Sequence, residues 1–152
     1  MTKTHHLRRA GPADAAAARD LTRAAYAKWI PLIGREPLPM RADYDRAVAE
    51  HLVDLWEEEG HLLALIETIP EADHLLIENL AVRPDQQGRG RGEGLLRHAE
   101  ELARSLGFSE LRLYTNAMFG GNVAFYARRG YEETERKVVV PGSITVFMRK
   151  RI

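Results

Sequence analysis

The chain has 152 residues, 45% of them hydrophobic, which suits one globular domain with its own buried core over residues 1–152. Its 22 Lys and Arg balance its 22 Asp and Glu, so the net charge gives no reason to expect nucleic acid or an anionic membrane as a partner. Cysteine is absent, which excludes disulfides, thiolate metal sites and a cysteine nucleophile.

The N-terminal half predicts a strand, two helices and then three strands. A strand over residues 4–10 is ended by Gly11 and Pro12. Asp14 can cap a helix that runs to about Trp29. The remaining elements of this half are a proline-rich loop over 31–40, a helix over 42–52 from near Asp43, strands over 52–56, 61–69 and 74–82, and turns at 58–60 and 70–73.

The C-terminal half begins with a long amphipathic helix over residues 90–106, which Gly107 is placed to stop. A strand over 109–115 follows, and then a short helix over 122–129. Strands over 131–140 and 144–149 complete the chain. This order of elements predicts a mixed α/β sheet.

The most informative segment runs from Gln87 to Gly94 and reads QGRGRGEG. Glycine occupies every second position there, between a strand and a long helix. Glycine lets the backbone turn tightly and approach a ligand closely, and the amides at a helix N-terminus carry partial positive charge. The segment therefore predicts a diphosphate site, and its arginines agree with an anionic ligand.

Two other glycine motifs do not fit this segment. A P-loop needs Lys followed by Ser or Thr after its last glycine, and the segment has neither. A dinucleotide fingerprint, G-x-G-x-x-G, fails because its third glycine would be Glu93 or Leu95. A glycine-rich helix start that binds no ligand stays open as the alternative.

These residues resemble a known family. Gln87-Gly88-Arg89-Gly90-Arg91-Gly92 is similar to the Q/R-x-x-G-x-G/A signature of the GNAT superfamily of N-acetyltransferases, and the flanking Leu80-Ala81-Val82 and Leu95-Leu96 are similar to its flanks. Downstream, Asn122-Val123-Ala124-Phe125-Tyr126 with Gly130-Tyr131 resembles the N-x-x-x-x-Y-x-x-x-G-F/Y block of that family. The order of elements is also similar over nearly the whole chain.

The resemblance implies a GNAT-like α/β fold, with a twisted, mostly antiparallel sheet of about six to seven strands, splayed at an acetyl-CoA site and flanked by about four helices. It implies acetyl-CoA as co-substrate, with its pyrophosphate on the amides of Gln87 to Gly92. The pantetheine arm would follow the strand backbone at Leu80, Ala81 and Val82. Arg89 or Arg91 would meet the phosphates, and Asn122 and Phe125 would lie along the pantetheine and adenine.

Acetyl transfer to an amine needs a base for the ammonium proton, a donor for the thioester oxygen and an acid for the departing thiolate. By resemblance, Tyr126 is the acid and a backbone amide near Leu80 is the donor. A tyrosine that only packs on the sheet is the alternative for Tyr126.

Glu78 is the best candidate for the base. Strand alternation puts Glu78 on one face with Leu80 and Val82, and Ile77-Glu78-Asn79-Leu80 resembles the segment of members that acetylate polyamines and small amines. A solvent-facing glutamate is the alternative. Weaker candidates are Glu67, His74 and Tyr114.

By resemblance, the acceptor pocket is built from the first two helices and the loop between them. Its candidate residues are Tyr26, Trp29, Ile30, Pro31, residues 35–40 and Tyr44. The same residues could equally be an apolar cover of the sheet. We expect direct transfer to a primary amine of a small molecule in a ternary complex, because no cysteine can form a covalent acyl intermediate.

Two other functions stay open: acetylation of a protein or peptide amine, and a non-catalytic acyl-CoA sensor that would need neither Glu78 nor Tyr126. No metal site is expected, since the histidines lack ligand spacing. A polar N-terminus and the absence of a long apolar run predict a cytoplasmic protein without a signal peptide or membrane span. By analogy with the family, a homodimer could use an edge at 138–140 and 144–147.

Overall fold

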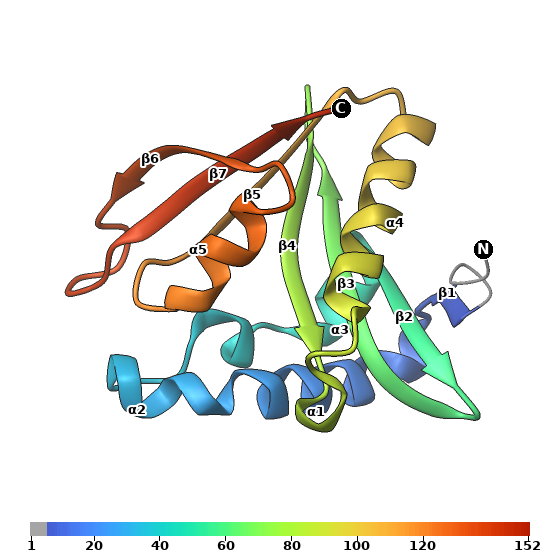
Figure 1. The fold of residues 1–152 in the computed structure, drawn as a ribbon. Helices are drawn as coiled ribbons and strands as arrows, with labels where there is room; N and C mark the ends of the chain where they lie inside the picture. The colour runs from blue at the N-terminus through green and yellow to red at the C-terminus, as the bar shows by residue number, and fades with distance from the viewer. Residues whose placement is uncertain (1–5) are drawn as a thin grey trace.

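The structure, a computed structural model, describes residues 6–152. Seven strands form one sheet in the order β1-β2-β3-β4-β5-β7-β6 (Figure 1). All neighbouring strands are antiparallel except β4 and β5, which run parallel. The strands are β1 (Leu7–Arg9), β2 (Leu52–Glu58), β3 (His61–Pro70), β4 (Leu75–Val82), β5 (Glu110–Asn116), β6 (Glu132–Lys137) and β7 (Thr145–Arg151). The expected mixed, mostly antiparallel sheet is therefore confirmed, although residues 4 and 5 of the first predicted strand lie outside the described residues.

The helices are α1 (Ala15–Tyr26), α2 (Ile30–Ile33), α3 (Tyr44–Glu50), α4 (Arg91–Ser105) and α5 (Gly120–Ala127). Asp43 begins α3 as expected, because its carboxylate accepts a 3.1 Å hydrogen bond from the amide of Arg46. The carboxylate of Asp14 instead accepts a 2.8 Å bond from the amide of Gly11, ahead of a short 3₁₀ turn that leads into α1.

Three local expectations are wrong in part. The first helix ends at Tyr26 and continues as a 3₁₀ turn over Ala27–Trp29. The segment 31–40 is not all loop, because Pro31 lies in the first turn of α2, where a missing N–H costs no hydrogen bond. The first strand of the last hairpin, expected over 131–140, ends at Lys137, so residues 138–140 form no strand edge for a dimer.

The helices cover both faces of the sheet (Figure 1). On one face α4 packs its buried side chains Leu95, Leu96, Ala99 and Ala103 with residues of β3, β4 and β5. On the other face α1 and α3 pack against β2 and β3 through a second cluster. Burial of Leu95 and Leu96 stabilises the packing of α4 on the sheet by about 2 kcal/mol for each side chain. The segment that precedes α4 is therefore attached to a firmly packed helix.

Candidate functional site

Strands β4 and β5 separate part of the way along the sheet. They pair only at Leu75, Leu76 and Ile77 of β4, which face Leu111, Arg112 and Leu113. Beyond Ile77, β5 continues to pair with β7 while β4 continues to pair with β3. Within the described residues, the β5-facing edge of β4 over 78–82 therefore has no strand partner, and its amide and carbonyl groups can bind an extended ligand.

A β-bulge lies where the two strands part. Thr68 of β3 faces Ile77, and Glu67 faces Asn79, so Glu78 is one extra residue in β4. The bulge interrupts the expected alternation, and the prediction that Glu78 shares a face with Leu80 and Val82 is wrong. The side chains of Leu80 and Val82 lie on the α4 face, whereas Glu78 lines two cavities on the side of α3 and the 37–39 segment.

The segment between β4 and α4 has the backbone that its glycines predict. Gly88 and Gly90 have φ values of 78° and 81°, in the left-handed region that favours glycine. Gly90 is the N-cap residue that precedes α4. Within the described residues, the amides from Gly88 to Glu93 have no backbone acceptor, as is usual for the first turn of a helix. The segment thus presents several free donors at the positive end of α4.

Gly92 lies against the ring of Phe125 on α5. A Cβ atom at this position would lie 3.0 Å from Cζ of Phe125, tighter than most real Cβ contacts, so the ring would have to shift. The absence of a side chain therefore lets α5 close over the N-terminus of α4. The guanidinium of Arg129 lies over the face of the same ring, 3.9 Å from its centroid.

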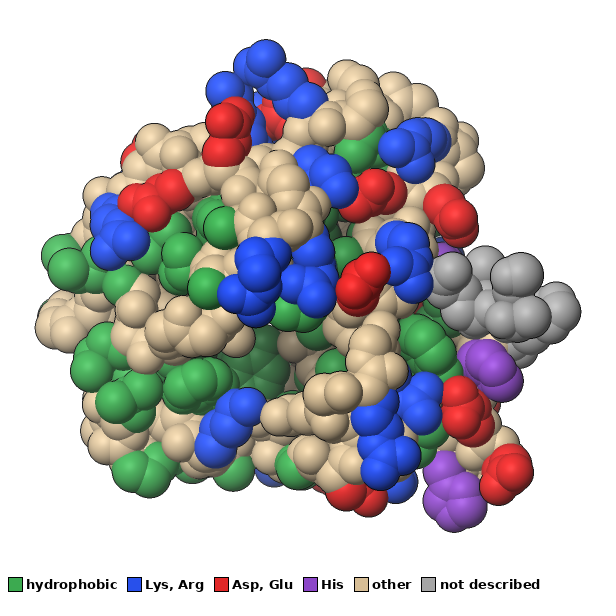
Figure 2. Space-filling model, in the orientation of Figure 1, with side chains coloured by type: hydrophobic (Ala, Val, Ile, Leu, Met, Phe, Trp, Pro, Cys, Tyr) green, Lys and Arg blue, Asp and Glu red, His purple; other side chains and the backbone are tan. Residues whose placement is uncertain are grey.

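A cavity of about 400 Å³ lies between this segment, the free edge of β4, the end of α1 and α5. Figure 2 shows the hollow on this face, with Lys and Arg side chains beside it. The predicted cofactor residues that line it are Leu80, Ala81, Val82, Gln87, Gly88, Gly90, Arg91, Gly92, Asn122 and Phe125. The structure thus brings together residues from three separate segments.

The two arginines expected at the phosphates lie differently. Arg89 is exposed and does not line the cavity. Arg91 lines it, but its guanidinium turns away and binds Glu58 at 3.0 Å and Gln86 at 2.8 Å and 3.0 Å. It also lies over the ring of Trp56. Arg91 therefore links the segment to β2 and is not a free cation.

Two further cations, which the sequence did not single out, also line the cavity. Lys28 from the turn after α1 donates a 3.0 Å hydrogen bond to Oε1 of Gln87. Arg129 reaches the cavity from the turn after α5. No local motif marks either residue, because each joins the cavity only through the packing of its helix.

Tyr126 also lines the first cavity, with 9% of its surface exposed. Its ring packs edge-on against Phe125 and Tyr131. Burial raises the pKa of the phenol to about 12. The phenol is therefore a protonated group at neutral pH, held beside the cavity.

A second cavity, of about 270 Å³, lies on the far side of Tyr26. Tyr26 lines both cavities, and its buried hydroxyl lies 2.9 Å from Oδ1 of Asn79 and 3.4 Å from the carbonyl oxygen of Leu80. Residues from the 33–39 segment, β5 and the 139–147 region line the rest of it. Of the acceptor-side candidates, Tyr26, Arg35, Pro37, Leu38 and Pro39 line this cavity, whereas Trp29 lines the first one.

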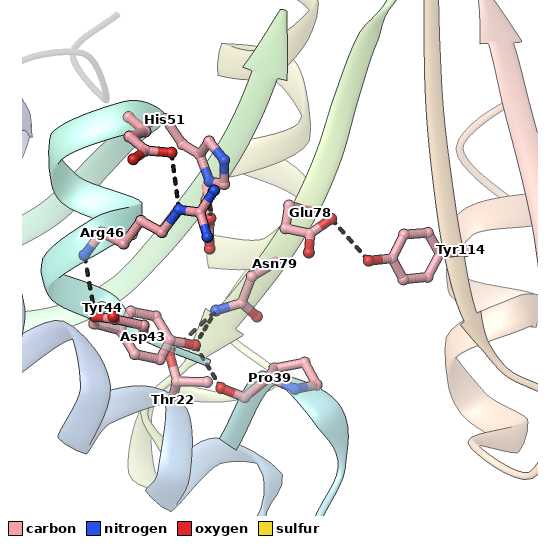
Figure 3. A network of polar contacts seen from close by, with 11 residues as sticks. Thr22, Pro39, Asp43, Tyr44, Arg46, His51, Glu78, Asn79 and Tyr114 are labelled. Carbon is pink, nitrogen blue, oxygen red and sulfur yellow. Dashed lines mark hydrogen bonds and ion pairs between the residues drawn. The ribbon is translucent and has the colours of Figure 1, made fainter. Parts of the chain in front are cut away.

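Glu78 and Tyr114 lie together at the second cavity. The hydroxyl of Tyr114 on β5 donates a 2.8 Å hydrogen bond to Oε1 of Glu78 (Figure 3). The neighbouring Asn79 points away from Tyr114 and donates to Thr22 and Tyr44, which fixes β4 to α1 and α3 (Figure 3). Tyr114, a weaker candidate from the sequence, is thus the direct partner of the predicted base.

The other weaker candidates lie elsewhere. Glu67 is buried and accepts a 2.6 Å bond from His51, and burial raises the pKa of its carboxyl above the usual value. Glu67 lines a third cavity, which it shares with Glu78. His74 bonds to the exposed Asp73 at the turn before β4 and lines neither of the first two cavities.

Two other features are absent from the described residues. Across residues 6–152, no cluster of three or more His, Asp or Glu side chains could hold a metal ion. No helix in that range has the length and apolar character to cross a membrane.

Known proteins resemble this chain in sequence and fold. The model of the acetyltransferase (GNAT) family matches residues 17–131. N-acetyltransferase family 8 member 3 of Rattus norvegicus is 28% identical in an alignment 102 residues long, which covers 61% of this chain. The same alignment covers only 45% of the rat protein, so the chain spans less than half of that relative.

Solved structures support the fold over nearly the whole chain. The PaiA N-acetyltransferase of Thermoplasma acidophilum, solved with coenzyme A, has a TM-score of 0.80 at 18% identity, over 96% of this chain and 98% of that one. The ribosomal-protein-S18-alanine N-acetyltransferase of Escherichia coli has a TM-score of 0.77 at 22% identity, over 96% and 92%. A GNAT family acetyltransferase of Elizabethkingia anophelis with acetyl-CoA bound has a TM-score of 0.73 at 15% identity, over 96% and 97%.

Proposed function

Because this chain belongs to the GNAT family of acetyltransferases, we propose that it transfers the acetyl group of acetyl-CoA directly to a primary amine of a small molecule. One observation carries the proposal: the unpaired edge of β4 lies between a cavity lined by the glycine segment and a second cavity that holds Glu78. A donor and an acceptor can therefore approach the same strand from two sides.

The first cavity fits coenzyme A. Free amides at the start of α4 suit a pyrophosphate, and the free edge of β4 suits the amide groups of a pantetheine arm. Lys28 and Arg129 add positive charge. When it is bound there, acetyl-CoA supplies an activated thioester whose carbonyl carbon accepts the amine.

The residues at the two cavities can then move the protons. Glu78 takes a proton from the ammonium, which frees the nitrogen lone pair for the new C–N bond, and Tyr114 holds this carboxylate in place. Tyr126 gives its proton to the sulfur as the C–S bond breaks. A β4 amide near Leu80 stabilises the charge that develops on the carbonyl oxygen.

The size of the second cavity favours a small acceptor. Its volume of about 270 Å³ lies just below the usual range for ligand pockets, roughly 300–1,000 Å³. A sensor without activity would have no use for a carboxylate and a phenol placed at the two cavities.

Acetyl-CoA titration by calorimetry tests the proposal, with Gly90→Glu compared to Gly107→Glu. Both glycines have φ near the same value, 81° and 86°, and open space around a new side chain, but Gly107 follows the far end of α4. The two variants thus carry similar backbone strain, and only Gly90→Glu puts a negative charge at the phosphate site.

We expect Gly90→Glu to lose acetyl-CoA binding while Gly107→Glu keeps it. Equal loss in both variants would show that strain, not charge, is responsible. No binding by the folded wild type would contradict the acetyltransferase function, and binding without CoA release over a broad amine panel would favour the sensor.

A further inference from the structure

The second cavity contains one cation and one anion in an otherwise uncharged lining. The anion is Glu78 and the cation is Arg35. The other lining residues are aromatic, aliphatic or neutral polar side chains, among them Leu38, Phe119 and Val139. This is the pattern of a pocket in which a few polar groups orient a mainly apolar ligand.

Arg35 has unused hydrogen-bonding capacity. Its Nη2 donates to Oγ of Ser143 at 3.0 Å, and its Nη1 donates to the carbonyl oxygen of Glu36 at 3.2 Å. A guanidinium has five N–H donors, so three remain. Among residues 6–152, no carboxylate oxygen lies within 4.0 Å of this guanidinium. A half-buried arginine with neutral partners only is suited to an incoming anion.

The position of Arg35 is fixed before a ligand arrives. Gly34 ends α2 with a left-handed backbone at φ 75°, which turns the chain so that Arg35 starts the next segment. Ser143, with 9% exposure, anchors the guanidinium from the loop before β7. The contact joins two segments 108 residues apart and closes one side of the cavity.

We propose that the acceptor is a zwitterionic amino acid with an apolar side chain, an inference that rests on the acetyl transfer proposed above. The ammonium group binds Glu78 next to the opening of β4 and β5. The carboxylate binds Arg35, and the side chain lies against the apolar lining. The reaction forms the N-acetyl amino acid and CoA, and Glu78 takes the ammonium proton.

This charge pattern disfavours the other amine classes. A polyamine carries no anion for Arg35, and its second cation would meet the guanidinium. An N-terminal peptide residue has an amide in place of the α-carboxylate, so it cannot form a charged pair with Arg35. The free amino acid and its amide therefore differ in the one group that Arg35 would recognise.

The test measures CoA release under saturating acetyl-CoA, with leucine, methionine and phenylalanine, their α-amides, a short peptide and spermidine as acceptors. The proteins are the wild type, Arg35→Met, Arg35→Lys and a control, Arg41→Met. Arg41 belongs to the same segment but is exposed and lines none of the three cavities described. Circular dichroism checks the fold of each variant.

For the wild type we expect kcat/KM for at least one free amino acid to exceed that of its amide by about tenfold or more, the effect of one charge-assisted hydrogen bond. Arg35→Met should raise the KM for the amino acid by about the same factor, with little change in kcat or in the KM for the amide. The KM of Arg35→Lys for the amino acid should lie between those of the wild type and Arg35→Met, and Arg41→Met should have the KM of the wild type.

Three results would each overturn the inference. The first is an equal kcat/KM of the wild type for the amino acid and its amide. This comparison can be made even if Arg35→Met fails to fold. The second is turnover of peptide or spermidine only, and the third is turnover of no acceptor while calorimetry still detects acetyl-CoA binding. Failure of acetyl-CoA binding itself would instead contradict the proposed acetyl transfer, so the two failures are distinguishable.

Discussion

The hydroxyl of Tyr114 on β5 lies 2.8 Å from Oε1 of Glu78 on β4, at the point where the two strands have stopped sharing backbone hydrogen bonds (Figure 3). A side-chain bond thus spans the opening in the sheet. Burial, and next the negative charge of Glu78, raise the pKa of this phenol above its usual value. Tyr114 therefore remains a hydrogen-bond donor at neutral pH and orients the carboxylate.

Glu78→Gln should lower kcat by about a hundredfold, a typical effect of removing a general base. The Kd for acetyl-CoA should stay unchanged, because Glu78 does not line the first cavity. Tyr114→Phe should lower kcat by about tenfold through loss of one hydrogen bond to a charged group. Steady-state kinetics and calorimetry measure both quantities. An unchanged kcat in Glu78→Gln would remove Glu78 from the mechanism.

Tyr126→Phe should also lower kcat, by about a hundredfold, if its phenol protonates the sulfur. Tyr131→Phe is the matched control, because Tyr131 packs against Tyr126 but does not line the cavity. The buried hydroxyl of Tyr131 has no hydrogen-bond partner among the described residues, so its removal should leave stability equal or slightly higher. Similar kinetic losses in both variants would indicate a packing defect instead of acid catalysis.

Gly92→Ala should weaken acetyl-CoA binding several-fold, because the new methyl group would meet Phe125 at 3.0 Å and push α5 away from α4. Phe125→Leu in the same chain should relieve the clash and recover part of the affinity. A double-mutant cycle by calorimetry measures this coupling. Gly121→Ala is the control, since a Cβ there meets no atom within 4 Å. Additive effects of the two substitutions would show that no such clash exists.

Asp54→Asn should lower the free energy of unfolding by about 2 kcal/mol. The carboxylate of Asp54 is buried and accepts bonds from Arg9 at 2.6 Å and His98 at 2.9 Å, which join β2 to β1 and α4. Asp20→Asn is the control, because its side chain is 68% exposed and its ion pair lies on the surface.

The effect of Asp54→Asn should also depend on pH. Burial opposes ionisation of Asp54, but the bonds from His98 and Arg9 outweigh it and lower the pKa of the carboxyl. Because the folded pKa is depressed, the stabilisation is present above the unfolded pKa of about 4 and is lost as the pH falls through the folded pKa. Urea denaturation at neutral and acid pH should therefore show the two proteins converging in acid. A difference in the free energy of unfolding between the two proteins that stays the same at both pH values would contradict this linkage.

Much of the glycine segment could be predicted from the sequence, because its geometry is local. Gly88 and Gly90 adopt left-handed backbone, and a long helix begins at Arg91, one residue from the predicted start. The amides of a first helical turn are free wherever such a helix begins. The order of helices and strands was also predictable, since it depends on periodicity and on turn residues in short stretches of chain.

The sequence by itself therefore determined the class of sheet, the family and the segment that precedes α4. Tertiary structure alone decided where the charged side chains lie and which residues they contact. The bulge at Glu78 arises from the register with β3, the outward turn of Arg91 comes from Glu58 on β2, and Arg35 is held by Ser143 from the far end of the chain. Each depends on a partner distant in sequence, and neither periodicity nor spacing within one segment encodes which distant side chain will be adjacent after folding.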